Sequence, residues 1–156
     1  MFRRFFDYNV TSLSATVRVF VTGFIAGVMT WLLMSGLTTY VLDPILCRSA
    51  GSYCSSVPTI ALVIALVIVH FVALIALIRL GILRPLLIIL AVVASLWGFH
   101  VWMGGKDWWI AALESGLIFG LAYLAYTWMN RLLSFPVALV FTVLGVIATR
   151  LIVISW

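Results

Sequence analysis

Residues 58–78, PTIALVIALVIVHFVALIALI, are the most aliphatic stretch of this chain, and they decide its fold class. The stretch contains no Asp, Glu, Lys or Arg, and His70 is the one side chain in it that titrates near neutral pH. About 20 consecutive apolar residues are enough for a helix to cross the roughly 30 Å hydrocarbon core of a bilayer. The stretch is therefore predicted to form a transmembrane helix.

The composition of the whole chain leads to the same conclusion. Of its 156 residues, 66% are hydrophobic and 8% are charged, with a mean hydropathy of +1.31. A soluble domain carries about 25% charged residues, so this chain lacks the polar surface that a globule in water needs. The net charge is +5, but the basic residues flank apolar stretches, as topology signals do. We expect an integral membrane protein that does not bind nucleic acid.

Four further stretches are apolar and long enough to cross a bilayer. We expect an all-α, polytopic membrane bundle of about five transmembrane helices in a single membrane domain over residues 1–156. Residues 1–18 combine aromatic side chains with arginine, which is typical of a segment at the membrane interface. They lack a short apolar region with a cleavage site, so we expect no cleaved signal peptide. The predicted spans are 19–42, 58–78, 85–103, 109–129 and 132–154.

The basic residues predict how the chain is threaded, because Lys and Arg are enriched on the cytoplasmic side of a membrane. An N-terminus inside and a C-terminus outside leave only Arg48, Lys106 and Arg150 on the outer side. We therefore expect this orientation, in the inner membrane of a bacterium. The remaining basic residues are then inside, namely Arg3, Arg4, Arg18, Arg79, Arg84 and Arg131.

The two cysteines of the chain, Cys47 and Cys54, both fall in the first predicted outer loop. In an oxidising compartment a pair at this spacing can close a small loop, and we predict a disulfide. Two free thiols or a metal pair are the alternatives. The spacing is not C-x-x-C, and few His or Asp residues lie nearby, so no metal site is expected.

Two predicted helices carry a GxxxG pattern, Gly23 with Gly27 and Gly116 with Gly120. Within each helix the two glycines share a stripe with other small residues. Such stripes let helix backbones approach closely inside a membrane. They predict helix packing, either within this bundle or against a partner subunit.

Residues 96–115, LWGFHVWMGGKDWWIAALES, concentrate the polar chemistry of the chain around a predicted outer turn. The tryptophans of this stretch are typical of the aromatic belt found at a membrane surface. A further tryptophan ends the last predicted helix. The predicted belt consists of Trp97, Trp102, Trp108, Trp109 and Trp156.

Four ionisable residues fall near the same outer level, His100, Glu114, Arg150 and Asp43. One interpretation is an interfacial girdle. The other is a polar site, because a carboxylate inside the membrane is costly unless it is protonated or paired, and His100 and Arg150 are candidate partners for Glu114. His70 lies deeper, where we expect a neutral imidazole bonded to a backbone carbonyl or a Thr hydroxyl. A bis-histidine haem does not fit two histidines at different depths, and no cofactor is expected.

No G-x-S-x-G, H-E-x-x-H or Walker pattern is present in the chain. The residues leave enzymatic activity open and favour a protein without one. The leading hypothesis is a subunit or modulator of a larger membrane assembly that acts through helix–helix contacts. Its partners would be membrane lipids and either other membrane subunits or further copies of itself. The alternatives are a small transporter or channel gated by Glu114, His100 and Arg150, and an enzyme that modifies lipid headgroups.

Overall fold

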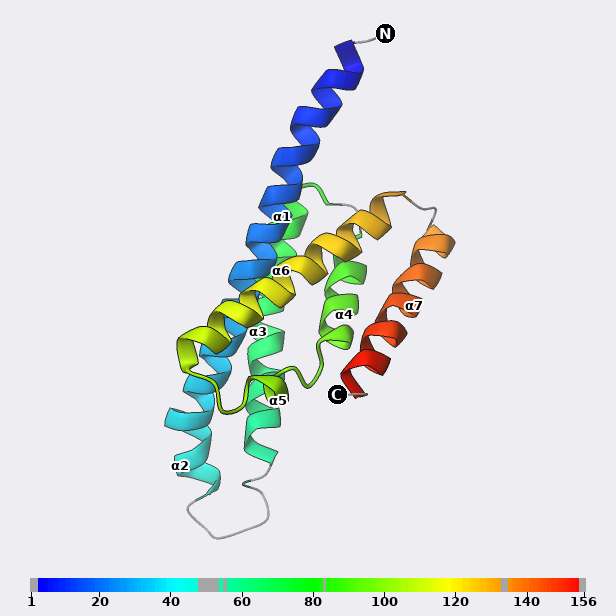
Figure 1. Cartoon of the computed structure of the whole chain (residues 1–156). Coiled ribbons are helices and arrows are strands. Elements are labelled where there is room, and N and C mark those ends of the chain that lie inside the picture. The colour runs from blue at the N-terminus through cyan, green and yellow to red at the C-terminus, as the bar shows by residue number, and fades with distance from the viewer. Residues whose placement is uncertain (1–2, 48–53, 55, 83, 133–134, 155–156) are drawn as a thin grey trace.

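The computed structural model describes residues 3–47, 54, 56–82, 84–132 and 135–154. All of the regular structure in these ranges is helical (Figure 1), which confirms the predicted all-helical fold. Successive long helices run in alternating directions along the bundle. In chain order the elements are α1 (Arg3–Gly36), a π-helical segment η1 (Leu37–Leu42), α2 (Asp43–Leu46), α3 (Val57–Arg79), α4 (Pro85–Ser95), α5 (His100–Met103), α6 (Trp108–Leu132) and α7 (Phe135–Ile154).

Three helical segments are long and apolar enough to cross a membrane. They are Ser14–Leu46, Val57–Arg79 and Trp108–Asn130. These segments contain the predicted spans 19–42, 58–78 and 109–129. Two shorter apolar helices, Pro85–Ser95 and Phe135–Leu151, accompany them.

The prediction of one uninterrupted helix over residues 85–103 is wrong. Helix α4 ends at Ser95, and the chain turns through Gly98, whose φ of +86° is a left-handed conformation that favours glycine. Helical structure resumes only for the single turn of α5. At 1.5 Å per residue, α4 is roughly 16 Å long, about half of a bilayer core. Hydropathy did not reveal the break because the residues on both sides of it are apolar.

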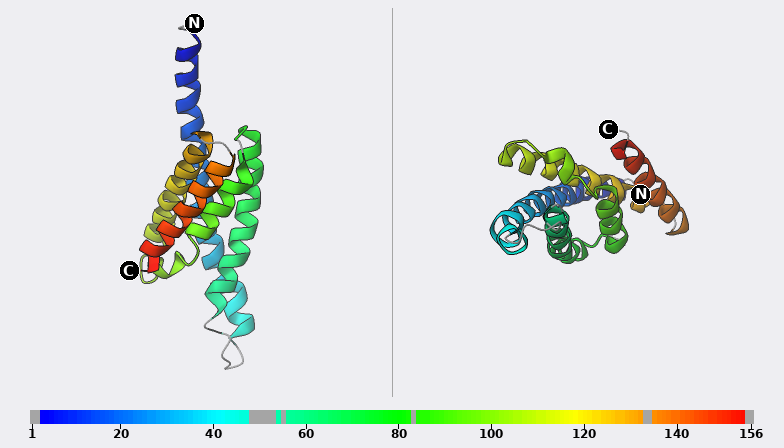
Figure 2. Two further views of the ribbon diagram at one scale, coloured as in Figure 1. Left: turned by 90° about the vertical axis from the view of Figure 1, so that its right-hand side faces the viewer. Right: turned by 90° about the horizontal axis from the view of Figure 1, so that it is seen from below.

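The N-terminal residues do not form a separate interfacial element. Helix α1 begins at Arg3 and continues without a break through residue 18 into the first long apolar segment. Its first turns extend beyond the other helices (Figures 1 and 2). Residues 1–2 lie outside the described ranges. The predicted boundary at residue 18 is therefore absent from the backbone.

The centre of the bundle is the contact between α1 and α6. A Cβ atom added at Gly27 would lie less than 3.0 Å from the Ser115 backbone and the Phe119 side chain, and one at Gly23 would meet Tyr123. In return, the α6 glycines receive aromatic rings from α1. Phe24 lies against Gly116, and Phe20 lies against Gly120. The two GxxxG faces thus pack against each other within one chain.

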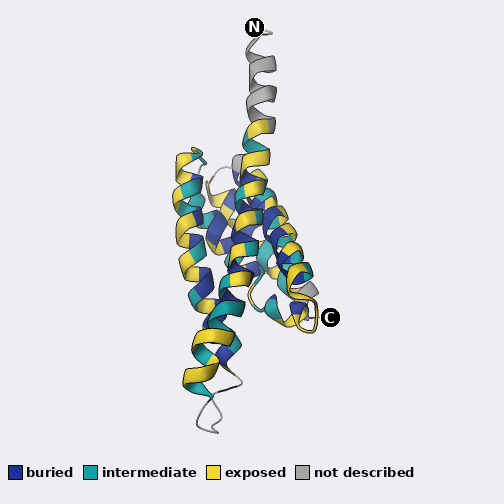
Figure 3. Cartoon of the chain, turned by 90° about the vertical axis from the view of Figure 1, so that its left-hand side faces the viewer, coloured by how far each residue is buried: buried dark blue, intermediate teal, exposed yellow. Residues whose placement is uncertain are grey.

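The outer surface of the bundle is apolar. Buried residues line the inner faces of the helices, while exposed residues cover the outside (Figure 3). Many of the exposed side chains are large and hydrophobic, including Val67, Phe71 and Leu90, which are between 64% and 67% exposed. Soluble monomers rarely expose a continuous apolar surface of this kind, whereas a surface in contact with lipid requires it.

Candidate functional site

Glu114 forms an ion pair with Lys106, so its partner is neither His100 nor Arg150 as expected. Glu114 lies in the second turn of α6, and Lys106 lies in the turn that precedes this helix. Gly105, with a φ of +80°, reverses the chain so that the lysine side chain can reach back along α6. The two side chains are 40% and 39% exposed. Solvent therefore reaches the pair, which is not a buried charge.

Arg150 binds the break between α4 and α5. Its guanidinium donates a hydrogen bond over 2.6 Å to the backbone carbonyl oxygen of Trp97. Carbonyl groups at the end of a helix lack partners within the helix, and Trp97 follows the end of α4. A cationic side chain is favoured at such a position. Arg150 thus fastens the last turns of α7 to the end of α4.

His100 is joined to neither of these contacts. It begins α5, and no hydrogen bond or ion pair links it to Glu114 or Arg150 among the described residues. Its Nδ1 atom is buried and has no hydrogen-bond partner there. Burial lowers the pKa of His100 from its ordinary value of 6.5. At neutral pH the imidazole is therefore uncharged.

Asp43 belongs to a different part of the molecule. It is the first residue of α2, and its backbone carbonyl accepts a hydrogen bond from the Cys47 amide. The four residues predicted to share an outer polar site therefore do not form one cluster. Two of them make separate contacts with Lys106 and Trp97, and the other two stand apart.

Cys47 and Cys54 form a disulfide, as predicted. Their Cα atoms are 5.4 Å apart, and the bond joins the end of α2 to the beginning of α3. Residues 48–53 of this loop lie outside the described ranges. Within the described residues, no group of three or more His, Cys, Asp or Glu side chains is arranged to hold a metal ion.

The predicted aromatic belt surrounds the connections of α5. Trp97, Trp102, Trp108 and Trp109 are between 37% and 69% exposed, and Trp156 lies outside the described residues. Exposed indole rings in this number suit a membrane surface, where the ring is apolar and its N–H can reach water or headgroups.

His70 is buried in the middle of α3. Its Nδ1 lies 3.0 Å from the carbonyl oxygen of Leu66, as expected from the sequence. Because a carbonyl can only accept, Nδ1 carries the proton and Nε2 is left as an acceptor. The ring stacks on Tyr123 and contacts Phe119.

Sequence reasoning did not anticipate a row of buried polar atoms on α6. The Tyr123 hydroxyl, the Thr127 hydroxyl and the Asn130 amide oxygen have no hydrogen-bond partner among the described atoms. These residues recur every three or four positions, so they share one face of the helix. That spacing could have identified the row in the sequence. The Asn130 amide nitrogen does donate to the Tyr126 carbonyl.

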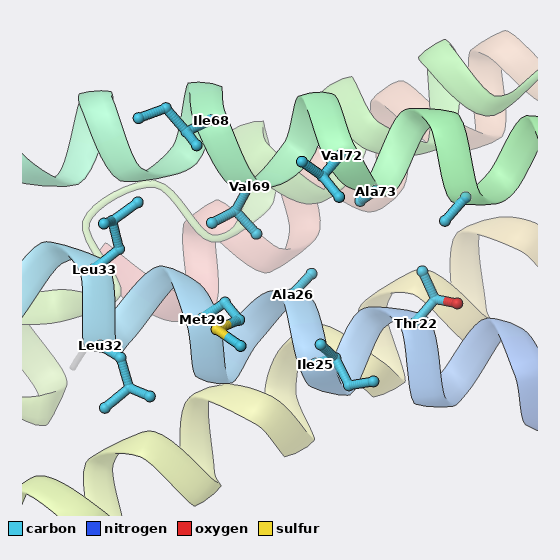
Figure 4. A pocket seen from close by; sticks show the side chains of 11 residues that line it. Thr22, Ile25, Ala26, Met29, Leu32, Leu33, Ile68, Val69, Val72 and Ala73 are labelled. Atoms are coloured by element: carbon cyan, nitrogen blue, oxygen red, sulfur yellow. The ribbon is translucent and has the colours of Figure 1, made fainter.

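Apolar grooves run between neighbouring helices on the outside of the bundle. One, with a volume of about 600 Å³, lies between α1 and α3 (Figure 4). Another, of about 680 Å³, lies between α4 and α7 and has Arg84 among its lining residues. These grooves are the described concave surfaces that could receive another molecule.

Comparison with protein-family models, curated proteins and solved structures finds no match for this chain. The function must therefore be inferred from the residues themselves.

Proposed function

We propose that the protein is a non-enzymatic integral membrane protein that acts as a subunit or modulator of a larger membrane assembly. It binds a transmembrane helix of another subunit in the groove between α1 and α3. The chain crosses the inner membrane of a bacterium five times, with its N-terminus inside and its C-terminus outside. The groove is the observation that carries this proposal.

The groove has a floor of small residues and walls of larger apolar ones. Ala26 and Ala73, at the floor, are 4% and 5% exposed. Ile25 and Met29 on α1 and Val72 on α3 form walls that are between 52% and 62% exposed. Small residues let a second helix approach closely in a membrane, where packing contacts drive association. Met29 adds a flexible side chain that adapts to its partner.

The lining positions on α1 recur with the period of a helix. Thr22, Ala26, Met29 and Leu33 follow one another at intervals of three or four residues, so they form one stripe (Figure 4). The stripe is roughly 16 Å long at 1.5 Å per residue, which is about three turns. A partner helix of the same length can pack along it.

The glycine faces are not available for the same purpose. Gly27 and Gly116 already contact side chains or backbone across the α1–α6 interface. A partner would have to separate these helices before it could reach the glycines. The α1–α3 groove requires no such opening.

The distribution of charge supports the proposed orientation. Residues 15–19 of α1, which include Arg18, line a groove together with Ile82 and the last turns of α6, so Arg18 lies at the same end as Arg79 and Arg84. Lys106 and Arg150 lie toward the opposite end, near α5. The end with more arginines is the cytoplasmic one under the positive-inside rule.

The experiment compares two photo-reactive positions in the full-length protein in its native membrane. A photo-reactive residue replaces Met29 in the groove or Leu144 on α7, which is similarly exposed and lines no described groove. We expect the Met29 position to give one protein adduct of defined mass in stoichiometric yield, and the Leu144 position to give lipid adducts. An adduct of twice the protein's own mass would identify the partner as a second copy.

A second variant tests whether the groove itself is required. Val72→Trp fills the groove from an exposed wall position, and Leu144→Trp adds the same bulk elsewhere. Val72→Trp should abolish both the adduct and co-purification of the partner in mild detergent, whereas Leu144→Trp should leave both intact. Lipid adducts alone at both photo-reactive positions would refute the proposal.

The transporter and enzyme alternatives are not proposed here. Both require Glu114, His100 and Arg150 to act together. Among the described residues, Glu114 is paired with Lys106 and Arg150 with the Trp97 carbonyl.

A further inference from the structure

The groove between α4 and α7 combines an apolar interior with a cationic end. Arg84 directly precedes α4, and its guanidinium carbon lies 5.1 Å from the centre of the Phe135 ring, at the start of α7. Both residues line the groove, which continues between Leu90 on α4 and Leu139 on α7. The positive charge therefore stands where the groove begins, between the first turns of its two walls.

Arg84 is held in an unusual backbone conformation. It has φ +58° and ψ +51°, and it is the one non-glycine residue with a positive φ in the described ranges. Residues other than glycine pay a steric penalty in this region, and such strain is concentrated at binding sites. The conformation begins α4 at Pro85 and directs the chain from the end of α3 into the groove wall.

The dimensions of the groove match one leaflet. Its α4 wall extends from Arg84 to Ala94, which is roughly 15 Å at 1.5 Å per residue. That length is about half of the roughly 30 Å hydrocarbon core. The groove also meets a second apolar groove, between α3 and α4, because Leu74 and Leu90 line both. There is therefore room for more than one hydrocarbon chain.

One polar side chain lies inside the groove. Thr142 lines it, is 5% exposed, and its hydroxyl has no hydrogen-bond partner among the described atoms. A buried hydroxyl without a partner is costly. An oxygen of a bound lipid in the groove would supply one.

We propose that this groove binds one anionic phospholipid of the cytoplasmic leaflet. The lipid phosphate accepts hydrogen bonds from the Arg84 guanidinium, and an acyl chain fills the groove between α4 and α7. Arginine has five N–H donors in a planar arrangement that matches phosphate oxygens, so its contact with Phe135 leaves donors for the headgroup. Basic pockets between membrane helices on the cytoplasmic side select anionic headgroups in this way. The site is separate from the α1–α3 groove and does not depend on the partner proposed for it.

The experiment measures lipid binding to the purified full-length protein in detergent by native mass spectrometry. Phosphatidylglycerol is compared with phosphatidylcholine of the same acyl chains, and inorganic phosphate is added as a competitor. We expect one phosphatidylglycerol molecule to bind about tenfold more tightly than phosphatidylcholine, because of the charge-assisted bonds to arginine. Equal affinity for the two lipids, or complete displacement by millimolar phosphate, would overturn the proposal.

Three variants assign the site. Arg84→Gln should remove the preference for phosphatidylglycerol, and Arg84→Lys should keep part of it. Arg79→Gln is the matched control, because Arg79 is an exposed arginine near the same end that does not line the groove. It should change the affinity less than about twofold, as expected for a general surface charge. Equal losses in Arg84→Gln and Arg79→Gln would contradict the site.

A fourth variant keeps the test valid if Arg84→Gln fails to fold. Leu139→Trp fills the groove from a position that is 43% exposed and leaves the charge in place. It should weaken phosphatidylglycerol binding at least tenfold while the helix content by circular dichroism stays unchanged. Unchanged lipid binding in Leu139→Trp would refute the groove as the binding site.

Discussion

Ser115 on α6 donates a hydrogen bond from its hydroxyl to the backbone carbonyl of Gly27 on α1, over 3.3 Å. The same hydroxyl also lies 3.0 Å from the carbonyl of Ala112 in its own helix. A short serine side chain can reach a backbone carbonyl across a helix interface only where the two helices almost touch. The absence of a side chain at Gly27 permits this approach, so the two residues explain each other.

Gly27→Ala should destabilise the protein, because the new Cβ atom would lie closer than 3.0 Å to the Ser115 backbone, which cannot move aside alone. We expect a loss of about 1–3 kcal/mol, the usual cost of overpacking a core. Gly36→Ala is the matched control, since nothing lies within 4 Å of its Cβ position. It should be neutral or slightly stabilising. Thermal unfolding in detergent measures both, and equal effects would contradict the interface.

Arg150→Met should loosen α7 from α4 without unfolding the bundle. The variant keeps an apolar chain of similar length but removes the hydrogen bond to the Trp97 carbonyl. We expect a loss of about 1–2 kcal/mol, typical of a bond from a charged donor. Hydrogen exchange should become faster in the last turns of α7 and unchanged in α3. Unaltered protection in α7 would show that the bond does not fasten this helix.

Glu114→Gln should have little effect on stability. The ion pair with Lys106 is about 40% exposed on both sides, and exposed pairs contribute about 0–1 kcal/mol. A double-mutant cycle with Lys106→Gln measures the coupling, which should fall as salt is added. A coupling above about 2 kcal/mol that persists at high salt would instead indicate a shielded site.

The cysteines should react with a thiol-blocking mass tag only after reduction, because Cys47 and Cys54 are bonded to each other. Replacing both by serine should destabilise the protein by about 2–3 kcal/mol, the entropy effect expected when such a short loop is no longer closed. Labelling of the unreduced protein would disprove the bond in the native membrane.

The sequence by itself determined the features that depend on local order along the chain. The aliphatic run at 58–78 was recognised as a long apolar helix, because length and hydropathy alone define one. The disulfide followed from two cysteines seven residues apart. The Leu66 carbonyl could be expected as the partner of His70, because a helix places it one turn away.

Only the tertiary structure decided which side chains meet across helices. Glu114 pairs with Lys106 rather than with His100 or Arg150, because the turn at Gly105 sets which cation can reach it. The helix break at Gly98 could not be read from hydropathy, since a change in φ leaves the apolar pattern intact. The contact of Arg84 with Phe135 joins residues far apart in sequence. Such contacts depend on how helices are rotated and spaced, which the packing of the whole bundle determines.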